Sequence, residues 1–248
     1  MNNFQTIKIN LLSDLNVERY DNSTVIKTLE IFSLNTYLYE IDSFVDNSLI
    51  DEISQLLINY VIHKEQNKTL FYNNYELNQK FNNIMENISV ILLNSCFSKK
   101  IYYFIIYHTT IIKNVIIIIY NYSIDINILK NLYSFLNEFM DNEDNFMSLI
   151  LANFLEMGII QTLDRYLHMK TYEIIFIILS LAVKCLEFGN VYKDKNKENK
   201  KYSKINFVQT FLDKKGFNDI LKLISSPDFG DNKCSDLAKN IQEIFFPF

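Results

Sequence analysis

Apolar residues recur at helical spacing along most of the chain, and short polar turns separate the apolar stretches. In the last stretch, Leu237, Ile241, Ile244 and Phe245 form one apolar stripe. The same pattern predicts further helices over 24–34, 49–62, 82–97, 111–120, 128–140, 172–188 and 234–246. With 4 glycines and 2 prolines, the chain lacks the frequent turns that a sandwich or barrel needs. The sequence therefore predicts an all-α fold.

Two segments near the C-terminus share a pattern that indicates an internal repeat. The segments 154–168 and 211–225 both read Phe-Leu-acid, a short turn, a glycine and then apolar residues at helical spacing. Gly158 and Gly216 occupy the same place, between a short helix and a longer one, where a positive φ allows a sharp bend. A unit that recurs in this way buries its apolar face against the next unit.

The distance between the repeats fits a helical solenoid. The two glycines lie 58 residues apart, and a lysine-rich stretch at 191–206, which we expect to be a 16-residue loop, accounts for the excess over 42. HEAT and armadillo units have periods of roughly 40 to 47 residues. A third copy fits with Thr110 at the glycine position, and a fourth contains 82–97. We therefore expect a right-handed superhelical solenoid of armadillo or HEAT type over 81–248, preceded by a divergent helical region at 1–80.

From about Ile106 to Phe246 the chain resembles the C-terminal armadillo repeats of importin alpha, the adaptor family that carries nuclear localisation signals. The resemblance rests on FLEMGIIQTLDRYLHMKTYEIIFIILSLAVKCLEFG, on the long loop that follows, on FLDKKGFNDILKLISS and on LAKNIQEIFF near the end. It implies a protein that binds basic peptide segments of cargo proteins in the cytoplasm and nucleus. It also implies a transport carrier of importin-beta or export-factor type as a partner.

In that family the third helix of each repeat presents a Trp and, four residues later, an Asn to the bound peptide. Residues at this spacing share one helix face, so an aromatic wall can hold a lysine stem while the amide pairs with the ligand backbone. This chain has no Trp, but Tyr133 stands at the aromatic position and Asn137 keeps the amide. Asn94 is the corresponding amide one repeat upstream. The resemblance thus implies a peptide-binding site at Asn94, Tyr133 and Asn137.

Charge and motifs argue against several other classes of function. The chain has a net charge of -5 and a pI near 5.3, which does not favour nucleic-acid binding. It contains no phosphate-binding glycine loop, no nucleophile turn and no histidine or cysteine spacing typical of a metal site. We therefore expect no catalytic activity, no metal and no cofactor.

The most apolar segments raise the possibility of a membrane protein. Segment 101–120 is interrupted near its centre by His108, Lys113 and Asn114, and two buried helices joined at Thr109 and Thr110 fit it better. Segment 174–183 is too short to span a bilayer before charged residues follow it. We therefore expect no membrane partner.

Two alternatives to the adaptor remain open. The first is a helical-repeat scaffold in a larger assembly, whose exposed apolar surface, such as the Ile-rich helix 111–120, is covered only in the complex. The second is a membrane-associated protein. The adaptor is the first hypothesis, the scaffold is the second and the membrane-associated protein is the third.

Overall fold

All regular structure in the described part of this chain is helical, which confirms the all-α prediction. The computed structural model describes residues 30, 47–107, 110–122, 124–139, 163, 165–168, 171–195 and 206–247. The chain divides into two compact units, unit 1 (Met1–Glu138) and unit 2 (Phe139–Phe248), each of which is described by itself below. A division near residue 80 would fall within helix α5 (Tyr75–Ser95).

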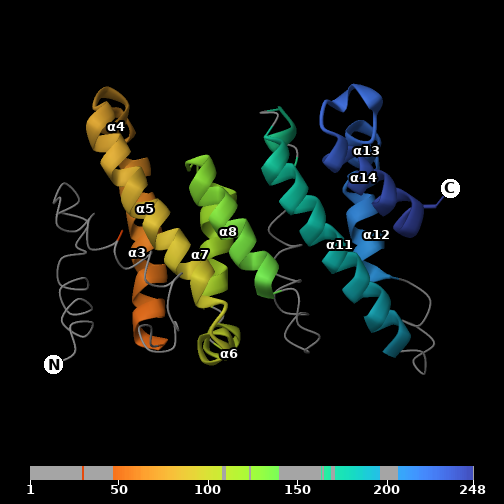
Figure 1. Ribbon diagram of the computed structural model, residues 1–248, viewed down its shortest axis with the longest axis horizontal. Coiled ribbons are helices and arrows are strands. Elements are labelled where there is room, and N and C mark those ends of the chain that lie inside the picture. The colour runs from red at the N-terminus through yellow and green to blue at the C-terminus, as the bar shows by residue number, and fades with distance from the viewer. Residues whose placement is uncertain are drawn as a thin grey trace. The chain divides into compact units, whose positions relative to one another are not determined.

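In the described part of unit 1, α3 (Asn47–Gln66), α5, α7 (Thr110–Asn121) and α8 (Ile126–Phe139) alternate in direction along the chain (Figure 1). α3 packs against both α5 and α7, so it lies at the centre of the unit. One helix ends at Tyr107 and the next begins at Thr110, in agreement with the junction predicted at the threonines. The helices of this unit are α3 (Asn47–Gln66), α4 (Lys68–Asn73), α5 (Tyr75–Ser95), α6 (Lys99–Tyr107), α7 (Thr110–Asn121) and α8 (Ile126–Phe139).

Polar side chains fix where these helices begin. Asn74 accepts a hydrogen bond from the Leu77 amide (3.0 Å) at the start of α5, and Ser98 accepts one from the Ile101 amide (3.2 Å) at the start of α6. Such caps satisfy backbone donors that have no partner within the first turn of a helix. They therefore end one helix and start the next within a few residues.

The Ile-rich helix α7 lies in the core of unit 1. Six of its apolar side chains are buried: Ile111, Ile112, Val115, Ile116, Ile118 and Ile119. The expectation that this helix exposes its apolar surface until a partner covers it is therefore wrong. α3 covers it within the same unit, because an isoleucine run this dense has apolar side chains on most sides of the helix.

An aromatic cluster joins α3, α4 and α5. The ring of Phe81 lies 4.9 Å from that of Tyr60 and 4.7 Å from that of Phe71, measured between centroids, and the His63 ring stacks on it at 5.8 Å. Tyr60, Phe71 and Phe81 are buried. These contacts hold the short helix α4 against the long helices on either side of it.

In the described part of unit 2, one long helix is followed by three shorter α-helices and a 3-10 helix. α11 packs against α12 and α14, and α14 packs against α13 (Figure 1). Gly216 has a φ of 82° and separates α12 from α13, as its sequence pattern predicts; Gly158 lies outside the described residues. The elements are α11 (Tyr172–Lys195), α12 (Phe207–Lys214), α13 (Phe217–Ile224), the 3-10 helix η3 (Pro227–Phe229) and α14 (Asn232–Phe245).

The lysine-rich segment is shorter than the loop predicted at 191–206. α11 continues to Lys195, and Asn206 is a buried N-cap rather than a loop residue. The Asn206 side chain accepts a hydrogen bond from the Gln209 amide (3.1 Å) and donates to the Leu186 carbonyl (2.9 Å). These two bonds tie the start of α12 to α11. Residues 196–205 lie outside the described part of the chain.

The predicted apolar stripe of α14 is partly wrong. Ile241 and Phe245 are buried, but Ile244 is exposed and the buried face continues through Ala238 and Cys234. The helix is turned this way because Cys234 packs at the start of α11, where its Sγ lies 3.3 Å from the Tyr172 carbonyl oxygen.

One described helix has the length and apolarity of a membrane span. Residues Tyr172–Val191 of α11 have a mean hydropathy of 2.0, and half of this stretch is buried within the protein. The expectation that segment 174–183 is too short fails because the helix runs on past Lys184 and Glu187. A core helix of a soluble protein has the same features, so length and composition alone do not assign α11 to a membrane.

We predict that Tyr60→Phe leaves the stability of unit 1 unchanged or raises it by up to about 1 kcal/mol. The Tyr60 hydroxyl is buried and has no hydrogen-bond partner in the described part of the chain, so the tyrosine bears a desolvation cost that phenylalanine avoids. Denaturant unfolding followed by circular dichroism measures the difference. A loss above about 1 kcal/mol would show that the hydroxyl has a partner after all.

The same variant has a pH signature. Burial raises the pKa of Tyr60 to about 12. Because the folded-state pKa lies above the unfolded value near 10, wild-type stability should fall between pH 10 and pH 12, with a limiting slope of about 1.4 kcal/mol per pH unit from this group. The difference between Tyr60→Phe and wild type should therefore widen over this interval and stay constant below it.

Candidate protein-binding site

The three residues predicted to bind a peptide lie on two neighbouring helices of unit 1. Asn94 is near the end of α5, and Tyr133 and Asn137 lie one turn apart on α8. Both helices run in the same direction in Figure 1. Asn94 and Asn137 are 43 residues apart, which is the predicted length of one repeat. Each of these amides lies near the C-terminal end of its helix.

A partly buried hydrogen bond joins these two helices close to the predicted register. The Asn131 side chain of α8 donates to Ser89 Oγ of α5 at 2.9 Å, across 42 residues of sequence. Ser89 is buried and donates its own proton to the Glu86 carbonyl (2.7 Å). Both hydrogen-bonding roles of this hydroxyl are therefore filled.

A second Asn–Ser bond joins the other two long helices of the unit. The Asn114 side chain of α7 donates to Ser54 Oγ of α3 at 3.4 Å, and Ser54 is buried. The first helix of one antiparallel pair thus packs against the first helix of the next pair, and the hydrogen bond from Asn131 to Ser89 links the second helices, α5 and α8. The sequence separation here is 60 residues and not 42, because α4 and the connections beside it lengthen the first pair.

Burial distinguishes the three predicted site residues. The Tyr133 side chain is only 1% exposed and Asn94 is 5% exposed, whereas Asn137 is partly exposed. The Tyr133 ring is thus part of the core of unit 1 in this structure. A peptide could reach that ring only if a neighbouring side chain or helix moved, whereas Asn137 is partly exposed, although its Oδ1 atom is buried.

A polar cluster that was not predicted lies where the α7–α8 turn meets α3 and α5. Lys64 Nζ donates to Asn82 Oδ1 at 2.6 Å, and Asp125 caps α8 by accepting from the Asn127 amide at 2.9 Å. Burial, and then the charge of Asp125, raise the pKa of Glu86, while a hydrogen bond from the Asn127 side chain opposes this shift. Burial also lowers the pKa of Lys64, against the influence of Asp125.

This cluster holds the turn in place and gives no sign of chemistry. Its members come from segments far apart in sequence, so no local motif could have identified it. One lysine stands against two carboxylates that repel each other, which is a costly arrangement to bury and explains why all of these groups keep some exposure.

In unit 2, the predicted repeat register places Ser180 and Lys184 of α11 at the positions of Tyr133 and Asn137. The Ser180 hydroxyl donates to the Phe176 carbonyl at 2.9 Å within its own helix. Lys184 is partly exposed, and its charge would repel a basic ligand. The pattern of a peptide groove therefore does not extend to this helix.

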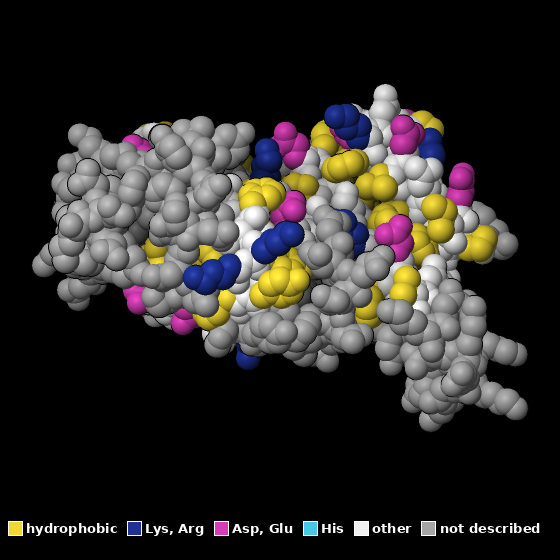
Figure 2. Space-filling view, turned by 60° about the horizontal axis from the view of Figure 1, so that its bottom comes forward, with side chains coloured by type: hydrophobic (Ala, Val, Ile, Leu, Met, Phe, Trp, Pro, Cys, Tyr) yellow, Lys and Arg dark blue, Asp and Glu magenta, His cyan; other side chains and the backbone are white. Residues whose placement is uncertain are grey.

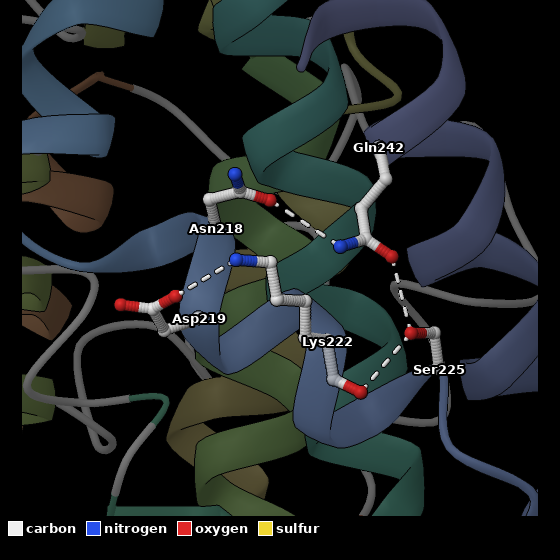
Figure 3. A network of polar contacts seen from close by, with 5 residues as sticks. All are labelled: Asn218, Asp219, Lys222, Ser225 and Gln242. Carbon is white, nitrogen blue, oxygen red and sulfur yellow. Dashed lines mark hydrogen bonds and ion pairs between the residues drawn. The ribbon is translucent and has the colours of Figure 1, made fainter. Parts of the chain in front are cut away.

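A polar network connects α13 to α14 near the end of the chain (Figure 3). Gln242 donates to Asn218 at 3.3 Å, and the Ser225 hydroxyl lies 3.1 Å from Gln242 Oε1. An ion pair between Lys222 and Asp219 at 3.1 Å lies beside it on α13. These groups are exposed or partly exposed, so they orient the two helices and contribute little to stability.

Apolar side chains reach the surface at several places. On unit 1, Tyr72 and Tyr75 flank the α4–α5 connection and are 91% and 78% exposed. Phe97 and Tyr103 are exposed at the opposite end of α5. Figure 2 shows hydrophobic side chains beside charged ones on the described part of one face. Exposed aromatic rings are typical of protein-binding surfaces.

The described residues offer nothing that resembles a catalytic or metal centre. No group of three or more His, Cys, Asp or Glu side chains within them could hold a metal ion. The three cysteines are buried, and burial raises the pKa of the Cys96, Cys185 and Cys234 thiols. A thiol with a raised pKa is a weak nucleophile at neutral pH because little thiolate is present.

Comparison with protein-family models and with curated proteins finds no match for this chain. The resemblance to importin alpha, the adaptor activity and the localisation in the cytoplasm and nucleus therefore stay predictions.

We predict that the Asn131–Ser89 bond couples α5 to α8 by about 0.5 to 1.5 kcal/mol. In a double-mutant cycle of Ser89→Ala and Asn131→Ala, the two losses in unfolding free energy should sum to more than the loss of the double variant. The pair Gln55→Ala and Asn59→Ala, which interacts across an exposed turn of α3 at 3.2 Å, serves as control and should couple weakly. Additive losses at Ser89 and Asn131 would contradict the stacking register.

Proposed function

We propose that this protein is a helical-repeat scaffold that works by binding other proteins, and that its helices form a right-handed superhelical solenoid of armadillo or HEAT type. The observation that carries the proposal is the stacking of like helices in unit 1. α3 bonds to α7 and α5 bonds to α8, each through an Asn–Ser pair with a buried serine. Repeat solenoids stack in this way, each unit contacting its neighbours.

Unit 2 supports the same arrangement. Tyr172 is the first residue of α11 and lies against Cys234, near the start of α14, so the two helices begin at the same level. The exposed face of α14 is mostly polar, with Lys233, Asp236, Lys239, Asn240 and Glu243. A polar exposed face of this kind is typical of a solenoid helix that has no further repeat packed against it.

If the protein is a scaffold, we expect a partner that contacts the end of unit 1 where Tyr72 and Tyr75 are exposed. Affinity purification of the tagged chain from its own cells, followed by gel filtration with light scattering, should yield one complex of fixed stoichiometry. Tyr72→Ala with Tyr75→Ala should weaken that complex at least 30-fold, because buried aromatic anchors contribute roughly 2 kcal/mol or more to an interface.

Leu223→Ala with Ile244→Ala, two exposed apolar residues of unit 2, is the matched control and should leave the complex intact. A chain that stays monomeric in its own cells, with no stoichiometric partner, would refute the scaffold. Equal weakening by both pairs of substitutions would place the contact elsewhere.

The second candidate is an adaptor of importin-alpha type that binds basic peptides in the cytoplasm and nucleus. What favours it is the surviving Tyr133–Asn137 pair on α8 with Asn94 on the adjacent α5. An acidic chain of net charge -5 also suits a basic ligand. A carrier of importin-beta or export-factor type would then be a second partner.

If the adaptor is correct, a fluorescent lysine-rich peptide should bind, and raising the salt concentration should weaken its binding. Asn137→Ala should then lower the affinity about tenfold, the loss expected for one hydrogen bond to a ligand backbone. Tyr133→Phe keeps the ring in the core and should bind as wild type does. Absence of peptide binding at low salt, or an unchanged affinity in Asn137→Ala, would exclude a site at these residues.

A further inference from the structure

Helix α6 exposes aromatic rings beside two lysines at one end of unit 1. Phe97, just before the helix, is 69% exposed, and Tyr103 within it is 52% exposed. Lys99 and Lys100 are exposed as well. The opposite side of the helix is anchored, since Ile101 and Ile105 are fully buried. We call Phe97, Lys99, Lys100 and Tyr103 the α6 patch.

The geometry of α6 presents this patch outward as one surface. Lys99 and Lys100 precede Tyr103 by four and three residues, so all three lie on one helix face. The Tyr102 ring supports the Tyr103 ring edge-on at a centroid distance of 5.8 Å. The axis of α6 turns by 107° from that of α5, so α6 lies across the end of the unit (Figure 1).

The sequence on both sides of α6 contains lysines but no acidic residue. From Asn87 to Ile124 the chain has three lysines and no Asp or Glu, although its net charge is -5. Neither Lys99 nor Lys100 forms an ion pair with a carboxylate among the described residues. Lysines in the first turn also oppose the helix dipole, so helix stability does not account for their position.

Aromatic rings interspersed with lysines on a short exposed helix suit the surface of a lipid bilayer. Tyrosine and phenylalanine insert at the level of the headgroups, and lysines are attracted to anionic lipids. We infer that the α6 patch docks this protein onto a membrane surface that carries anionic lipids, with α6 lying in the plane of the interface.

Other partners fit the patch less well. A nucleic acid needs a longer track of positive charge than one pair of lysines on an acidic protein. An acidic protein segment would satisfy the lysines but would leave two exposed rings without an apolar partner. The sequence favours no membrane partner because it lacks a clear span, whereas docking on a membrane surface needs no span.

The inference does not depend on the scaffold or adaptor activity, and its test uses vesicles instead of proteins. The whole chain should sediment with vesicles of phosphatidylcholine containing 30% phosphatidylserine, and far less with vesicles of phosphatidylcholine alone. Lys99→Gln with Lys100→Gln should lower the partition coefficient about 30-fold, since each lysine near an anionic surface contributes roughly a factor of five. Phe97→Ala with Tyr103→Ala should lower it at least tenfold.

Matched controls separate the α6 patch from charge and apolarity in general. Lys214→Gln with Lys215→Gln removes two adjacent exposed lysines from unit 2, and Tyr72→Ala with Tyr75→Ala removes two more exposed rings from unit 1. Both should bind vesicles as wild type does, and circular dichroism should show that all variants fold.

Three results would overturn the inference. The first is a wild-type chain that does not bind the anionic vesicles, and the second is equal binding by the α6 variants and the controls. The third is tight binding of poly-glutamate or an oligonucleotide to the α6 patch without vesicle binding, which would assign the patch to an acidic macromolecule instead.

Discussion

Stacking of like helices is the constraint on which the rest of unit 1 depends. α3 is the central helix, because α5 and α7 both pack on it, and α8 in turn bonds to α5. The apolar faces of these helices tolerate many rotations and shifts, since the hydrophobic effect is not directional. Two Asn–Ser hydrogen bonds with buried serines restrict that freedom, because a slip of one turn would break the bond from the asparagine amide to each serine hydroxyl.

The helices themselves follow from the sequence because their cause is local. Periodic apolar residues, a dense isoleucine run and a scarcity of glycine and proline predict helices at 111–120, 128–140 and 172–188, and the structure has α7, α8 and α11 there. Gly216 is predicted for the same reason, since a sharp bend between two helices needs a residue free to take positive φ. Helix ends are less accurate: α11 continues through charged residues that the sequence pattern assigns to a loop.

The site could be predicted only in part, because exposure is a property of the whole fold. The sequence places Asn94, Tyr133 and Asn137 on two successive helices, and the structure brings those helices together. It does not reveal which face of α8 turns inward, and a tyrosine is compatible with either side. Tyr133 turns inward together with Leu129 and Leu136, so the core of this unit contains the ring that the family resemblance assigns to a ligand. The polar cluster at Glu86 and Asp125 depends on tertiary contacts, which no spacing in the sequence records.

Charges of opposite sign lie at different places in the described part of unit 1. Acidic side chains gather where the α7–α8 turn meets α5, and the α6 end has lysines and aromatic rings with no acidic residue in the adjoining sequence. A protein that only needed solubility would distribute both signs of charge evenly over its surface. Aromatic rings left exposed beside unpaired lysines at one end carry a solvation cost that the fold of unit 1 does not require, since Ile101 and Ile105 already anchor α6. Contact with something outside the chain is the remaining physical reason for that arrangement.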